Sequence, residues 1–290
     1  MTATAGSPGA TSTGTPGSVG SADGAAAVTP TTADRVRQVV VTVSEVFCVI
    51  GTLVGVGVLG TSVSDTSGGA LSAQATLIAP AGPAFSIWSV VYLGLAAYTV
   101  WQWLPANAAS ARSRATGWLA AVSMILNAVW LLVTQQGWIW VSVVVILALA
   151  ITLGLLVQRL TTLASTSLVE RVIVDGTFGL YLGWVAVATC ANVTAALVAS
   201  DVDPGRPVSE ILAVVVLAVA AVLGVVFALR LGGRWSVAVA MAWGLAWIGA
   251  GRLGATDLDS TTTAVGAIVA AVVVLVAAFR THRPAPHRAA

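Results

Sequence analysis

The chain has 290 residues, of which 58% are hydrophobic and only 8% are charged. Soluble domains carry about 25% charged residues, so this composition excludes an ordinary soluble protein. The apolar runs are too long for the strands of a membrane barrel and lack strict alternation, so we expect an all-α integral membrane protein. Neither the net charge of +2 nor any motif indicates a nucleic-acid partner, whereas membrane lipid is an expected one.

Residues 1–33 are rich in Ser, Thr, Gly, Ala and Pro and have no apolar period, so they are predicted to form a disordered tail. The apolar stretches that follow have lengths near the ~20 residues that a bilayer-spanning helix needs. We expect eight such helices, at about residues 38–60, 85–104, 115–133, 138–158, 172–198, 209–229, 235–251 and 262–279. The expected units are a five-helix unit at 34–200, a three-helix extension at 201–280 and a tail at 281–290.

The arginines predict the orientation of these helices. All 13 basic residues are Arg, and with eight crossings all but Arg206 and Arg252 fall on one side of the membrane. Six acids fall with those two, on the opposite side: Asp65, Asp201, Asp203, Glu210, Asp257 and Asp259. The positive-inside rule therefore predicts a protein of the cytoplasmic membrane with both termini in the cytoplasm.

The second expected helix is rich in aromatic residues. Trp88 and Tyr92 are four residues apart, so they share one helix face and fit either an interfacial aromatic belt or a pocket wall. Trp101 and Trp103, at the far end of this helix, fit an interfacial belt.

Polar side chains accompany these rings inside the membrane. With the predicted orientation, Asn127 and Trp130 lie in the outer half of the third helix, and Trp88 lies in the outer half of the second helix. Trp184 in the fifth helix is followed on the same face by Ala188 and Asn192. An amide in hydrocarbon is costly unless it is hydrogen-bonded, so the two asparagines either join helices or contribute to an aromatic-walled pocket.

Three segments resemble the signatures of the TspO/MBR family of translocator and tryptophan-rich sensory proteins: FSIWSVVYLGLAAY, LNAVW and YLGWVAVATCAN. The residues that match the family patterns are Phe85, Trp88, Tyr92, Leu126, Asn127, Trp130, Tyr181, Leu182, Trp184, Val185, Ala188, Thr189 and Asn192. The resemblance covers residues of about 38–198, and it leaves three helices that the family's basic unit does not have.

This resemblance implies a five-helix bundle with a ligand pocket under the first loop. Family members bind porphyrins and other hydrophobic ligands, some bind cholesterol, and some promote light-dependent porphyrin breakdown. The family's pocket residues correspond to Trp88, Asn127, Trp184 and Ala188 here. The first loop, residues 61–84, has neither the Trp nor the basic residue usual in the family, so porphyrin carboxylates would lack a counter-ion there.

We therefore expect a receptor, sensor or carrier for a hydrophobic aromatic ligand, such as a porphyrin, another tetrapyrrole or a sterol, with no required cofactor or metal. The expected ligand-binding residues are Trp88, Tyr92, Asn127, Trp130, Trp184, Ala188 and Asn192. Two alternatives stay open: a proton-coupled transporter and a light-dependent tetrapyrrole-degrading protein. No nucleophile and base are arranged for ordinary catalysis, so enzyme activity stays uncertain.

Two acids fall within the expected helices and are candidates for proton coupling. Glu45 is expected in the cytoplasmic half of the first helix, neutral through burial or paired with an Arg from another helix. Asp175 lies four residues beyond Arg171, a spacing that favours a surface ion pair.

Small residues and a tryptophan pair leave further alternatives open. Gly51 with Gly55, and Gly179 with Gly183, have the spacing that allows close helix contact, either within the bundle or in a homodimer. Trp243 and Trp247 in the seventh helix are either packing residues or part of a second pocket.

Overall fold

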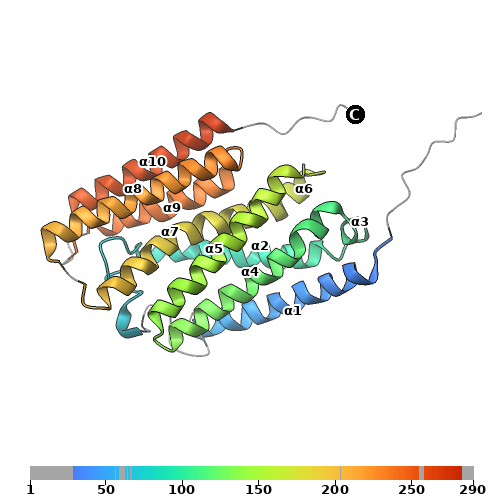
Figure 1. Cartoon of the computed structure of the whole chain (residues 1–290), viewed down its shortest axis with the longest axis horizontal. Helices are drawn as coiled ribbons and strands as arrows, with labels where there is room; N and C mark the ends of the chain where they lie inside the picture. Colours follow the sequence, from blue (N-terminus) through green and yellow to red (C-terminus); the bar gives the residue numbers. More distant parts are fainter. Residues whose placement is uncertain are drawn as a thin grey trace, which may run out of the picture.

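The computed structural model describes residues 29–282 except 56, 59–62, 64, 66, 203 and 255–257. Within these residues the chain is helical and contains no strand (Figure 1). The main helices are α1 Thr32–Gly55, α2 Ile87–Trp101, α4 Ala111–Gln135, α5 Ile139–Thr162, α7 Thr177–Val198, α8 Arg206–Arg230, α9 Trp235–Gly251 and α10 Thr261–Thr281. Short turns of helix lie between them: η1 Ser67–Gly69, η2 Gly82–Ser86, α3 Pro105–Ala108, α6 Leu168–Glu170 and the π-helical η3 Arg171–Gly176.

Among the described residues, seven helical segments are long and apolar enough to cross a membrane, and α9 is a shorter apolar helix of 17 residues. The prediction of an all-α multi-pass membrane protein is therefore confirmed. Successive main helices run in opposite directions, so the connections between them lie alternately at the two ends of the bundle (Figure 1). One of these ends is the end where α1 begins. We call that end the arginine end, because Arg37, Arg112 and Arg234 lie there, and the opposite end, which carries η1 and η2, the loop end.

The helices form two groups that meet along α7 (Figure 1). The first group contains α1, α2, α4, α5 and α7, and its closest pairs are α1 with α4, α4 with α5, and α5 with α7. The second group contains α8, α9 and α10, which lie side by side on one flank of the molecule. The second group meets the first mainly through α9, which packs along α7, with a smaller contact from α8.

The first helix begins earlier than its hydropathy predicts, at Thr32 rather than residue 38. The backbone amide of Thr31 donates to the Asp34 carboxylate (3.0 Å), and the Asp34 amide donates to the Thr31 hydroxyl (3.3 Å). This reciprocal pair satisfies two amides at the start of the helix, in the manner of a capping box. The helix therefore begins within the last residues of the predicted tail 1–33, while residues 1–28 lie outside the described part.

Small residues allow the closest helix approaches. A Cβ atom on Gly51 would lie 2.9 Å from the Cβ of Ala128 in α4, closer than carbon atoms pack. Cβ atoms on Gly179 and Gly183 would collide with Ser236 and Val237 of α9. Both glycine pairs therefore serve contacts within the chain, and a homodimer stays a prediction.

Asp175 lies in a buried ion-pair cluster at the arginine end, and the predicted surface pair with Arg171 is wrong. Its carboxylate accepts from Arg112 of α4 (2.7 Å) and from Arg234 beside α9 (2.6 Å), and Arg112 also pairs with Glu170 (3.0 Å). In the π-helical turn the backbone bonds run from residue i to i+5, so positions four apart no longer share a face. Asp175 consequently turns inward while Arg171 stays exposed.

The tryptophans at the end of α2 have different roles. Trp103 is 40% exposed and donates through Nε1 to the Thr42 hydroxyl (3.0 Å), as an interfacial residue would. Trp101 is buried and lies nearly parallel to the ring of Tyr98, with centroids 6.2 Å apart. The predicted interfacial position is therefore wrong for Trp101.

Candidate functional site

The segment that leads into α2 places two aromatic rings at the loop end. Pro83 occupies the first turn of η2, where its missing amide is tolerated, and the chain continues directly into α2. Phe85 on this turn meets the ring of Trp184 edge to face, with centroids 5.7 Å apart. One turn later, Trp88 faces the same helix, α7.

Trp88 is at the centre of a cluster of four rings. It lies edge to face with Tyr181 (5.7 Å) and with Trp184 (6.3 Å), both from α7. On its other side it stacks on Tyr92, with centroids 5.2 Å apart and planes inclined by 15°. Such pairs contribute about 0.5–1.5 kcal/mol each beyond the area they bury, so the cluster holds its rings in defined orientations.

Two polar groups in this cluster have no hydrogen-bond partner among the described residues. Asn127 is buried and donates to the Tyr92 hydroxyl (3.1 Å) and to the Cys48 sulfur (3.3 Å), which leaves its carbonyl oxygen unpaired. The indole N–H of Trp184 is also buried and unpaired. One acceptor and one donor without a partner among the described residues are therefore buried in the same apolar region.

Asn192, in contrast, is fully engaged in joining helices. Its carbonyl accepts from the indole N–H of Trp130 in α4 (2.8 Å), and its amide donates to the hydroxyl of Ser142 in α5 (3.0 Å). Of the two alternatives that the sequence leaves open, the structure therefore favours interhelical bonding for Asn192.

A cavity lies between α2, α4, α5 and α7 and contains about 30 Å³ of space. Its lining residues are Phe85, Trp88, Asn127, Trp130, Ile146, Leu149, Trp184, Val185 and Ala188. Sites for drug-sized ligands measure roughly 300–1,000 Å³, so a flat aromatic ligand must displace side chains to enter.

Five of the seven residues predicted to bind ligand line this cavity: Trp88, Asn127, Trp130, Trp184 and Ala188. Tyr92 and Asn192 lie one layer behind, against Trp88 and Trp130 respectively. The sequence analysis missed Phe85 as a lining residue, although the family pattern contains it. It also missed Ile146 and Leu149, which look like any other apolar residues of a spanning helix. The role of these residues in ligand binding stays a prediction.

Glu45 lies buried near this site and has no described hydrogen-bond partner for either carboxylate oxygen. It is close enough to interact electrostatically with Cys48, Tyr92 and Tyr181. Because α1 begins at Thr32, Glu45 lies near the middle of that helix rather than in its cytoplasmic half as predicted. Asp175 lies at the arginine end, so the two acids do not share a site.

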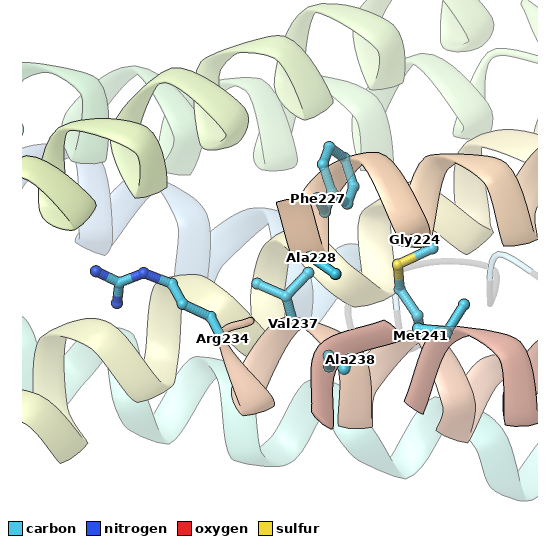
Figure 2. Close-up of a pocket in the computed structure, with 9 residues that line it drawn as sticks. Gly224, Phe227, Ala228, Arg234, Val237, Ala238 and Met241 are labelled. Carbon is cyan, nitrogen blue, oxygen red and sulfur yellow. The ribbon is translucent and has the colours of Figure 1, made fainter. Parts of the chain in front are cut away.

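A second, smaller cavity of about 10 Å³ lies among α8, α9 and α10. Figure 2 shows that its walls are apolar and that the guanidinium of Arg234 points away from the other labelled residues. A space of this size holds one water molecule at most, so it is a packing defect rather than a ligand site. Trp243 and Trp247 do not line it.

A family model described as TSPO-like protein matches residues 40–280. The chain belongs to the TSPO-like family. The match extends through α10, so the three helices that appeared additional in the sequence lie within the region shared with the TSPO-like family. Comparisons with curated proteins and with solved structures gave no match.

Proposed function

We propose that this TSPO-like protein is a membrane receptor, sensor or carrier that binds a flat, largely apolar aromatic molecule in the cavity beside Trp184. The observation that carries the proposal is a buried donor and a buried acceptor, Trp184 Nε1 and Asn127 Oδ1, that have no partner among the described residues and belong to the walls of an aromatic cavity. A buried polar group without a partner costs about 1–3 kcal/mol, and a ligand that supplies the partner recovers that free energy.

The chemistry of the lining limits the ligand. The ligand would accept a hydrogen bond from the indole N–H of Trp184, donate one to the carbonyl oxygen of Asn127 and stack against the ring of Trp88. The described cavity wall contains no charged side chain. Arg252 contacts the segment above the cavity, but it is buried and its guanidinium donates to the carbonyls of Thr76 and Ala73. A neutral ligand is therefore favoured, or an anionic one whose charge remains in water, and a porphyrin or other tetrapyrrole meets these requirements without any further cofactor.

A binding screen of the purified full chain tests this proposal. Quenching of tryptophan fluorescence would be measured with mesoporphyrin dimethyl ester, with the free porphyrin diacid and with a sterol. Ala188→Phe fills the cavity from a partly buried position and should abolish quenching by whichever probe binds, while the unfolding temperature stays within a few degrees of the parent. Equal binding by the parent and by Ala188→Phe would place the site elsewhere.

A second candidate, a proton-coupled transporter, is favoured by the position of Glu45. A buried carboxyl that has no hydrogen-bond partner among the described residues, in the middle of a membrane helix near the cavity, is a suitable proton carrier. Asp175 is less suited, because two arginines hold its carboxylate. In proteoliposomes with a pH gradient, Glu45→Gln should abolish gradient-driven uptake of a bound probe but leave its equilibrium binding intact. Uptake that is independent of the gradient in the parent would exclude this candidate.

A further inference from the structure

The segment 73–86, which carries Phe85 to the cavity, is tied to helix α9. The indole N–H of Trp243 donates to the carbonyl of Ala84 (2.9 Å). Three residues earlier in the segment, the amide of Ala81 donates to the carbonyl of Trp247 (3.2 Å). These two bonds connect the turn that opens α2 to two successive turns of α9, although the residues are more than 150 positions apart in sequence.

Arg252, which follows directly after α9, extends this attachment. Its two terminal nitrogens donate to the carbonyls of Thr76 (3.1 Å) and Ala73 (3.0 Å). The residue is only 3% exposed, and burial lowers the pKa of its guanidinium against the opposing effect of Asp259. A desolvated cation depends on its hydrogen bonds more than an exposed one, so these two contacts hold the start of the segment firmly.

Helix α9 also contacts the cavity wall from behind. A Cβ atom on Gly244 would lie 3.0 Å from a methyl carbon of Val187, a tight contact, and 3.5 Å from the Trp184 ring, so α9 passes close to both residues here. Ala240, one turn earlier, belongs to the same buried apolar cluster as Ala84 and Trp184. The helix therefore supports both Trp184 and the segment that carries Phe85.

We propose that α9 and Arg252 form a latch on the ligand site, with Trp243 and Arg252 as positioning residues that hold segment 73–86 closed over the cavity. The cavity of about 30 Å³ is too small for a flat aromatic ligand, and two of its rings, Phe85 and Trp88, lie on or directly after the latched segment. Ligand exchange therefore requires the segment to move away from α9, and the strength of the latch sets the rate at which ligand enters and leaves. The ligand part of this inference rests on the proposed function, whereas the attachment itself does not.

Hydrogen–deuterium exchange of the full chain, without ligand, tests the attachment. Arg252→Gln removes the charge and one arm of the fork, and Trp243→Phe removes the indole donor but keeps a ring. Each should accelerate exchange of the segment's hydrogen-bonded amides, Ala81 above all, by about tenfold. Trp235→Phe is the matched control, because Trp235 lies on the same helix at the arginine end against Phe279 and His282. Unchanged exchange in Trp243→Phe and Arg252→Gln would overturn the latch.

Binding kinetics with mesoporphyrin dimethyl ester test the control of ligand exchange. In both latch variants the association and dissociation rates should rise together by about tenfold, with a smaller change in affinity, since an opening step is common to entry and exit. Faster amide exchange with unchanged ligand rates would overturn the gating role. If the probe binds neither the parent nor the variants, the proposed site fails for this ligand class, while amide exchange still decides whether the latch exists. Should Arg252→Gln fail to fold, the milder Trp243→Phe alone decides both measurements.

Discussion

Replacing Asp175 by Asn should destabilise the bundle strongly. The Asp175 carboxylate accepts from Arg112 and Arg234 at 2.7 and 2.6 Å, and all three side chains are at least four-fifths buried. Removing one partner from a buried ion pair typically costs about 3–5 kcal/mol, because the other charge is left uncompensated. Arg112 keeps a second acid, Glu170, at 3.0 Å, so the lower limit of about 3 kcal/mol applies.

Thermal unfolding in detergent measures this loss, with Glu45→Gln as the matched carboxyl-to-amide control. A loss of about 3 kcal/mol corresponds to a decrease of about 6–12 °C in the unfolding midpoint, at 2–4 °C per kcal/mol for a large domain. Glu45 has no described partner to lose, so Glu45→Gln should leave the midpoint unchanged or raise it. A decrease in Glu45→Gln as large as that in Asp175→Asn would refute the reasoning, because it would mean that unpaired and paired buried acids contribute equally.

Two further predictions concern helix packing and orientation. Gly183→Leu should separate α7 from α9, because even a Cβ atom at this position collides with Val237 and Ala240; a decrease of several degrees in the unfolding midpoint is expected, and an unchanged midpoint would argue against this packing. Both termini should lie in the cytoplasm, since all but two arginines fall on one side. A reporter enzyme active only outside the cytoplasm, fused after Ala290, should therefore be silent, and activity would contradict the predicted orientation.

The sequence was sufficient for the class of fold and for most of the cavity wall. Hydropathy identifies spanning helices because the bilayer sets their length, and the spacing of four between Trp184 and Ala188 identifies a common face because α7 is regular there. The same reasoning fails at Asp175, where a π-helical turn changes the periodicity and brings in partners about 60 residues away.

Other features depend on contacts that one helix cannot reveal. Tyr92 shares a face with Trp88, but stacking places it behind that ring rather than beside the cavity. Ile146 and Leu149 enter the wall only because α5 packs between α4 and α7. The pairing of Trp243 with Trp247 can be read from their spacing of four, but the hydrogen bond of Trp243 to Ala84 is visible only once α9 is placed against the start of α2.

The affinity of Trp184→Ala for a porphyrin diester tests the central claim most directly. Removal of the ring eliminates about 0.5–1.5 kcal/mol of stacking beyond the lost area, together with one hydrogen bond worth about as much. Because tenfold in affinity equals about 1.4 kcal/mol, equilibrium titration should show binding weakened by at least about tenfold, while Trp235→Ala at the arginine end binds like the parent. Equal affinity of Trp184→Ala and the parent, or a loss in Trp235→Ala instead, would contradict a ligand site at this cavity.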